Sequence, residues 1–137
     1  MATSQSLGNV LIVEDDLATR EMLVSLLAVA GFHAVAAEDG LEGLHVLRTI
    51  RHRAPQTPCF ILLDLSMPRM GGREFRRAQL NDPMVATVPV AIMSGAADAS
   101  ALSQPLGAVA TFSKPLDIAY LLEVLRDHCG GSLTPAD

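Results

Sequence analysis

The sequence has few cysteines, few basic residues and no long hydrophobic run. Its 137 residues include two cysteines, Cys59 and Cys129, and ten lysines and arginines against fifteen acids, which gives a formal charge of −5. This deficit of positive charge provides no attraction to phosphate backbones and argues against nucleic acid as a direct partner. The cysteines show no CxxC spacing and predict no disulfide framework, so we expect two thiols in a reducing compartment.

No apolar run approaches the ~20 residues that a membrane-spanning helix needs. The first eight residues also lack the basic start and apolar stretch of a signal peptide. We therefore expect a cytoplasmic protein with no membrane partner. Low-complexity runs and internal repeats are missing as well, and half of the residues are hydrophobic, so the sequence predicts one globular domain. We place an N-terminal extension at 1–8, the domain at 9–129 and a tail at 130–137.

Short apolar runs alternate with helical patterns along the domain. The runs cover 10–13, 60–63, 88–93 and 109–112, with a weaker run at 33–37. Helices are expected at 17–30, 41–53, 72–80 and 116–128, with a shorter helix at 96–103. Continuous apolar runs indicate strands that are buried on both faces. Five βα repeats predict an α/β fold of the flavodoxin-like, doubly wound class, with a parallel sheet in the order 2-1-3-4-5.

Polar residues follow four of these expected strands. Glu14, Asp15 and Asp16 follow the first, and the other strands lead into Asp64, Ser94 and Lys114. The carboxyl ends of parallel strands share one edge of a sheet, so these side chains should converge there.

Carboxylates crowded at one edge repel one another, and a divalent cation relieves the repulsion. Oxygen ligands without nearby histidine or thiolate indicate Mg²⁺, with Mn²⁺ as an alternative. The ammonium of Lys114 and the hydroxyl of Ser94 suit phosphoryl oxygens. Together these groups match what phosphoryl transfer to a carboxylate nucleophile requires.

The sequence resembles the receiver domains of two-component response regulators. The matching stretches carry the acid run after Val13, a D-x-x-M-P-x-M-x-G pattern that starts at Asp64, Ser94 followed by Gly-Ala, and the Lys114-Pro115 dipeptide. The resemblance covers nearly the whole chain, and these motifs occur in the family's order.

This resemblance implies a role for each residue of the acidic site. Asp64 matches the phosphoacceptor, and Asp15 and Asp64 match direct metal ligands. Ser66 matches the position that offers its backbone carbonyl to the metal, and Glu14 matches the acid that acts through a bound water. Asp16 falls one place beyond this pair, where a helix N-cap is the simpler reading.

The resemblance also implies the partners and the activity. Ser94 and Lys114 match the hydroxyl and the ammonium that contact the phosphoryl group, and the Lys114–Pro115 bond is cis in the family. The donor would be a histidine kinase or a histidine phosphotransfer protein, and phosphorylation would switch a docking surface for an unidentified downstream protein. A homodimer is left open. The domain would be regulatory rather than an enzyme, catalysing only its own phosphorylation and dephosphorylation.

The chain departs from the family pattern in three places. Thr111 occupies the position of the usual aromatic switch residue, and Phe112 follows it. The helix expected at 96–103 has only about two turns before Gln104-Pro105. The connection at 51–59, with Pro55 and Pro58, is longer than usual.

Three other interpretations remain at this point. A flavodoxin-like site for a cofactor phosphate would use the same edge, but it favours backbone amides where this chain has acids. A phosphorylation-independent interaction module could use the same scaffold. The chain could also be a receiver excised from a hybrid histidine kinase or a longer regulator.

Overall fold

The computed structural model of the chain describes residues 8–50, 58–65, 67, 69–95 and 106–130. A five-stranded parallel sheet forms its centre, with the strand order β2-β1-β3-β4-β5 that the sequence predicts. The strands are β1 (Gly8–Val13), β2 (Phe32–Ala37), β3 (Phe60–Asp64), β4 (Val90–Ser94) and β5 (Ala110–Ser113).

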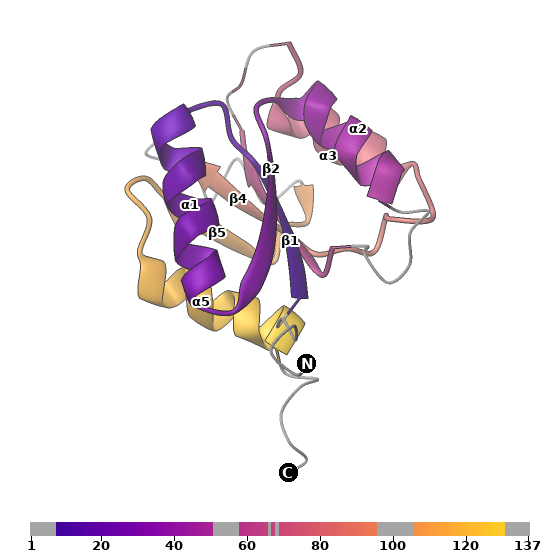
Figure 1. The fold of residues 1–137 in the computed structure, drawn as a ribbon. Coiled ribbons are helices and arrows are strands. Elements are labelled where there is room, and N and C mark those ends of the chain that lie inside the picture. The colour runs from indigo at the N-terminus through magenta and orange to yellow at the C-terminus, as the bar shows by residue number, and fades with distance from the viewer. Residues whose placement is uncertain (1–7, 51–57, 66, 68, 96–105, 131–137) are drawn as a thin grey trace.

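Helices cover both faces of this sheet. They are α1 (Leu17–Val29), α2 (Gly40–Ile50), α3 (Gly72–Leu80) and α5 (Ile118–Leu125), which continues into the π-helical turn η3 (Arg126–Gly130). Helices α1 and α5 lie on one face, and α2 and α3 lie on the other (Figure 1). None of the helices in the described part of the chain has the length and apolarity to span a bilayer. The short helix expected at 96–103 and most of the 51–59 connection lie outside the described residues.

The three central strands β1, β3 and β4 each contribute to two separate apolar layers, as their continuous hydrophobic runs predict. In β1, Val10 and Ile12 face the layer under α1 and α5, whereas Leu11 and Val13 face the layer under α2 and α3. The four side chains are at most 1% exposed. Burial of this kind stabilises the fold by about 25 cal/mol for each Å² of apolar surface removed from water. The two layers fix the orientation of the strands, and so decide which residues reach the carboxyl edge.

The last helix begins two residues later than the sequence pattern predicts. Asp117, expected in its first turn, is instead the N-cap, because its carboxylate accepts a hydrogen bond of 3.1 Å from the backbone N–H of Tyr120. The difference moves the start of α5 away from Lys114 and leaves the Lys114-Pro115-Leu116 segment outside any helix or strand, between β5 and α5.

The expectation of two free thiols is wrong. Cys59 and Cys129 form a disulfide, with their Cα atoms 5.5 Å apart. Their separation of 70 positions in the sequence concealed the pairing. In a βα fold, however, the start of a strand and the end of a helix lie at the same amino edge of the sheet. Cys59 directly precedes β3 and Cys129 lies at the end of the terminal helical segment, so the topology brings them together.

Candidate functional site

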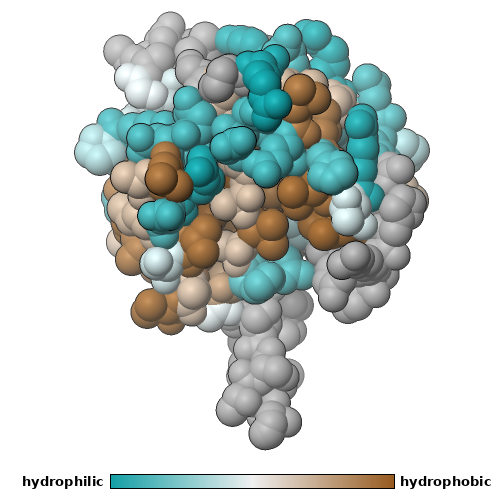
Figure 2. Space-filling view, turned by 45° about the horizontal axis from the view of Figure 1, so that its top comes forward, coloured by the Kyte–Doolittle hydropathy of each residue, from teal (hydrophilic) through white to brown (hydrophobic). Residues whose placement is uncertain are grey.

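Three carboxylates meet at the carboxyl edge of the sheet. Glu14 and Asp15 directly follow β1, and Asp64 is the last residue of β3. One oxygen from each lies within 4.8 Å of the others. Glu14 and Asp64 are buried, whereas Asp15 is exposed to solvent, so the cluster opens on one side. Figure 2 brings this edge forward and shows hydrophilic residues over much of its upper part.

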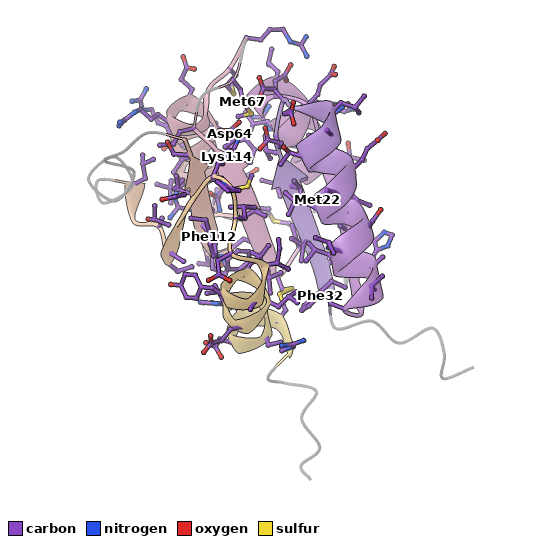
Figure 3. All side chains as sticks on the ribbon, turned by 90° about the vertical axis from the view of Figure 1, so that its left-hand side faces the viewer. Met22, Phe32, Asp64, Met67, Phe112 and Lys114 are labelled. Atoms are coloured by element: carbon purple, nitrogen blue, oxygen red, sulfur yellow. A yellow bond between two sulfur atoms is a disulfide. The ribbon has the colours of Figure 1, made fainter. Side chains whose placement is uncertain are left out.

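Lys114, which directly follows β5, contacts two of these carboxylates. Its Nζ lies 2.9 Å from Oε1 of Glu14 and 3.3 Å from Oδ2 of Asp64. Asp64 and Lys114 lie side by side at the end of the molecule where Met67 is also labelled (Figure 3). The Lys114–Pro115 bond is cis, as the resemblance implies. The single ammonium therefore contacts two buried carboxylates and neutralises the charge of only one.

Glu14 carries one carboxylate oxygen that is not fully satisfied. Its Oε2 accepts hydrogen bonds from Lys114 Nζ at 3.2 Å and from the backbone N–H of Asp16 at 3.0 Å. Its Oε1 is buried and has no partner in hydrogen-bond geometry, so the 2.9 Å approach of Lys114 is an ion pair without a well-directed hydrogen bond. A buried carboxylate oxygen in this state favours a further positive group.

Asp64 is electrostatically unlike an ordinary aspartate. Burial, together with repulsion from the carboxylate of Glu14, raises its pKa to about 7, against the opposing charge of Lys114. Burial lowers the pKa of Lys114, but its interactions with Glu14 and Asp64 outweigh that effect and leave its pKa above the usual value. Without a bound cation, Asp64 is thus only partly ionised near neutral pH.

Asp16 takes the capping role rather than a place in the cluster. Its carboxylate accepts hydrogen bonds from the backbone N–H of Thr19 at 2.9 Å and from the Thr19 hydroxyl at 2.6 Å, at the start of α1. These hydrogen bonds lower the pKa of Asp16. The guanidinium of Arg20, one turn further on, donates to the backbone carbonyl of Glu14 at 2.9 Å and secures the strand end. The register of the acid run is therefore Glu14 and Asp15 at the cluster and Asp16 at the helix.

Ser94 and Ser66 complete the list of expected site residues. Ser94 ends β4, is 5% exposed, and its carbonyl accepts a hydrogen bond of 3.1 Å from the backbone N–H of Lys114. The structure thus places Ser94 at the same edge as Lys114. Ser66, expected to offer its carbonyl to the metal, lies outside the described residues.

The two candidates for the switch position point to opposite faces of β5. Phe112 is buried in the layer under α1 and α5, and its ring lies 5.1 Å from that of Tyr120. Thr111 pairs with Ile92, which belongs to the layer under α2 and α3. Phe112 therefore does not replace the aromatic residue that Thr111 lacks.

An ion pair that the sequence did not reveal supports the loop after Asp64. Arg69, at a left-handed φ of 63°, donates from Nε to Oδ2 of the buried Asp39 at 2.6 Å. Burial raises the pKa of Asp39, but backbone hydrogen bonds and the Arg69 guanidinium outweigh it and hold that pKa below its usual range. A non-glycine residue at positive φ carries no clear sequence signal. The same loop ends at Gly72, where a larger residue would clash, because a Cβ there would lie 2.6 Å from the carbonyl oxygen of Asp64.

The donor set fits a hard divalent cation. It consists of carboxylate oxygens from Glu14, Asp15 and Asp64, and one of these, Oε1 of Glu14, is buried without a hydrogen bond. Within the described residues no histidine or cysteine joins the group. Three carboxylates with an open, solvated side suit Mg²⁺, which keeps several waters of its own.

Comparison with known proteins agrees with this arrangement. Residues 10–126 match the family model of the response regulator receiver domain. The polar-differentiation response regulator DivK of Brucella anthropi is 27% identical over 125 residues, which cover 89% of this chain and 96% of DivK. A probable transcriptional regulatory protein of Picosynechococcus sp. is 29% identical over 87% of this chain. The chain spans only 48% of that relative's length.

Solved structures show the same fold. The receiver domain of a signal transduction histidine kinase from Syntrophus aciditrophicus has a TM-score of 0.77 at 26% identity, covering 90% of this chain and 91% of that one. Chemotaxis protein CheY4 of Vibrio cholerae has a TM-score of 0.74 at 26% identity, covering 88% and 97%. The chain therefore belongs to the response regulator receiver domain family, and it is a regulatory domain of two-component signalling.

Proposed function

We propose that Asp64 accepts a phosphoryl group from a phosphohistidine of a histidine kinase or a histidine phosphotransfer protein. The observation that carries this proposal is the position of Lys114, whose Nζ lies 3.3 Å from Oδ2 of Asp64 within the three-carboxylate cluster. A carboxylate nucleophile, a cationic side chain beside it and a hydroxyl group at the end of the next strand are the groups that phosphoryl transfer uses. The phosphorylated cyanobacterial response regulator RcpA has a TM-score of 0.70 at 25% identity, which supports the same chemistry.

The transfer is a displacement at phosphorus. An oxygen of the Asp64 carboxylate forms a new bond to phosphorus as the phosphorus–nitrogen bond of the phosphohistidine breaks, and the released imidazole nitrogen takes a proton. Lys114 would turn its ammonium from Asp64 toward a phosphoryl oxygen, and the hydroxyl of Ser94 would donate to another. Both groups stabilise charge that increases on the phosphoryl oxygens during transfer.

Glu14, Asp15 and Asp64, together with the backbone carbonyl of Ser66, would hold Mg²⁺ or Mn²⁺. When bound, the cation would neutralise the negative charge of the carboxylates and of the phosphoryl group. Before transfer, Asp64 must be ionised, although in the absence of a cation its pKa is about 7. Glu14, fully buried and poorly satisfied at Oε1, supplies a fixed negative charge at the inner side of the cluster.

The proposed role is regulatory, within a receiver domain that spans residues 9–129 of a cytoplasmic protein. Phosphorylation would change a docking surface for a downstream protein, as a monomer or a homodimer. The buried Phe112 and the absence of an aromatic residue at Thr111 mean that this readout would not use an aromatic side chain at that position. A phosphorylation-independent interaction module is the competing function, and it predicts no reaction at Asp64.

Intact-mass spectrometry after incubation with acetyl phosphate and Mg²⁺ tests the proposal. Wild type should gain one phosphate, and hydroxylamine should remove it because acyl phosphates react with this nucleophile. Asp64→Asn should gain none. Asp16→Asn is the matched control, since asparagine still caps α1, and it should be phosphorylated like wild type. An adduct on Asp64→Asn that equals the wild-type adduct would refute Asp64 as the acceptor.

A further inference from the structure

The disulfide lies at the edge of the sheet opposite the acidic cluster. Cys59 directly precedes β3, and Cys129 lies within η3, at the end of the terminal helical segment. In Figure 3 the bond between the two sulfur atoms is found at the end where Phe32 is labelled, far from Asp64 and Lys114. The bond therefore plays no direct part in the chemistry proposed for Asp64.

The backbone beside the bridge has no room for a side chain at Gly8. Gly8, at the start of β1, has a φ of +145°, a backbone conformation that residues other than glycine rarely adopt. A Cβ at this position would lie 2.6 Å from Sγ of Cys59 and 3.4 Å from Cβ of Cys129. Glycine at the first position of β1 therefore leaves the space that the two cysteines occupy.

The two cysteine residues differ in their exposure to solvent. Cys59 is half-buried, whereas Cys129 is only 7% exposed and belongs to the apolar layer under α1 and α5. Sγ of Cys59 also lies 3.3 Å from the carbonyl oxygen of Asn9. After reduction this carbonyl can accept a hydrogen bond from the Cys59 thiol, so the reduced form has a place in the same structure.

The bridge connects two segments that also meet at the acidic cluster. One segment runs from Cys59 through β3 to Asp64, and the other runs from Lys114 through α5 to Cys129. The contacts Asp64–Lys114 and Cys59–Cys129 therefore link the same two segments at their opposite ends. Beside the bridge, the ring of His128 lies 5.3 Å from that of Phe60. The oxidation state of the cysteines therefore bears on how firmly the end of α5 is held to the sheet.

From these observations we infer that Cys59 and Cys129 form a reversible dithiol–disulfide site, which exchanges with a low-molecular-weight disulfide such as oxidised glutathione and anchors the end of α5 when oxidised. A chain of this length with two buried apolar layers does not need a staple to fold. The bridge thus has a role other than making folding possible.

The exchange proceeds in two balanced steps. The thiolate of Cys59, the more exposed of the two cysteines, attacks one sulfur of oxidised glutathione, forming a mixed disulfide and releasing one glutathione thiolate. The thiolate of Cys129 then attacks the Cys59 sulfur and releases the second glutathione thiolate. The two protons lost by the cysteines protonate the two released thiolates. The protein dithiol is oxidised by two electrons, and oxidised glutathione is reduced to two glutathione molecules.

The test uses the full chain in glutathione buffers of varied redox ratio, quenched with acid, alkylated and measured by intact mass. Wild type should show no alkylated cysteine in oxidising buffers and two alkylated cysteines in reducing buffers, and the change should be reversible. Cys129→Ser should accumulate a glutathione adduct on Cys59, at least about tenfold more than Cys59→Ser accumulates on the buried Cys129. Equal adducts on both variants would contradict the order of attack. Two alkylated cysteines at every ratio, or a disulfide that is reduced only in denaturant, would overturn the proposed site.

Hydrogen exchange of wild type tests the anchoring without any substitution. At exchange times too short for global unfolding to contribute, amides of 118–130 should exchange at least about tenfold faster in the reduced protein than in the oxidised protein, while those of 10–29 keep their rates. Equal rates for 118–130 in both states would refute the effect on α5. Because neither measurement involves phosphorylation, failure here is independent of the function proposed for Asp64.

Discussion

Lys114 Nζ lies 2.9 Å from the buried Oε1 of Glu14, an oxygen that has no hydrogen bond. Lys114 is also the single lysine in a chain whose other basic residues are arginines. A compact ammonium on a flexible stem can leave one carboxylate for another anion, which the planar, forked guanidinium of arginine does less readily. The pair therefore combines a firm hold on Glu14 with the freedom to engage a phosphoryl oxygen at Asp64.

The single lysine makes this ion pair measurable by chemistry. Without Mg²⁺, Lys114 should react with acetic anhydride more slowly than the N-terminal amine, because its interactions with Glu14 and Asp64 raise its pKa and occupy its ammonium. Glu14→Gln should accelerate the acylation of Lys114 several-fold, since a neutral amide stabilises the ammonium less. Peptide mass spectrometry after timed quenching gives both rates. Glu21→Gln, at an exposed acid of α1, is the control, and an equal acceleration by this variant would contradict the role of Glu14.

Much of the fold followed from the sequence because burial on both faces leaves continuous apolar runs. Val10–Val13 and Phe60–Asp64 show this pattern, and the acids and the lysine that end such runs could only converge at one edge. Glu14, Asp15 and Asp64 were found in this way.

Contacts that depend on loop conformation could not be predicted from the pattern of apolar runs. The pairing joins Asp39 to Arg69, 30 positions later in the chain, and it requires a left-handed backbone at Arg69. Neither residue type predicts this conformation or this contact. The disulfide is a different case, because the topology already placed Cys59 and Cys129 at one edge. The misleading signal was their distance in sequence.

The pH dependence of stability should change when Asp64 loses its charge. In the absence of a divalent cation the pKa of Asp64 is about 7 in the folded protein, against about 3.9 for an unfolded chain. The unfolded state therefore releases this proton first, and stability falls as pH rises from about 4 to about 7, by at most about 4 kcal/mol. Asp64→Asn should remove this decline and be more stable than wild type at pH 7 in EDTA.

Urea unfolding at several pH values measures this difference. Asp82→Asn, which changes an aspartate away from the cluster, serves as the control and should keep the wild-type decline. Wild-type stability that stays level between pH 4 and pH 7 would show that Asp64 is already ionised in the folded state.

The acid run should separate into a metal ligand and a helix cap. Asp15→Asn should weaken Mg²⁺ binding at least about tenfold, because it removes one of three carboxylates in the cluster. Asp16→Ala should leave the affinity within about twofold. It should lower the midpoint of thermal unfolding, because the N–H and hydroxyl of Thr19 lose their acceptor. Isothermal titration calorimetry with MgCl₂ and thermal unfolding in EDTA distinguish the metal ligand from the helix cap. The opposite pattern would mean that Asp16 is the ligand and Asp15 the cap.

A buried polar network should make Gln79 important for stability. Its amide nitrogen donates to the carbonyls of Val85 and Val88 at 2.9 and 3.1 Å, and its oxygen accepts from the buried guanidinium of Arg76 at 2.6 Å. Gln79→Ala removes one hydrogen-bond partner from each of these groups and should lower the free energy of unfolding by roughly 3 kcal/mol. Arg73→Ala, at an exposed position of the same helix, should change it by less than about 0.5 kcal/mol. Equal losses in urea unfolding would contradict the network's contribution.

Reduction of the disulfide should destabilise the fold without abolishing it. The bridge closes a loop across 70 positions, and the chain-entropy relation gives about 4 kcal/mol for a loop of that length. For a domain of this size the midpoint of thermal unfolding should fall by roughly 10 °C. Differential scanning calorimetry with and without a phosphine reductant measures the shift in wild type. In Cys59→Ser/Cys129→Ser the reductant should have no effect, and the midpoint should lie near that of the reduced wild type. A wild-type midpoint that is the same in both buffers would mean that the bridge places no constraint on the unfolded chain.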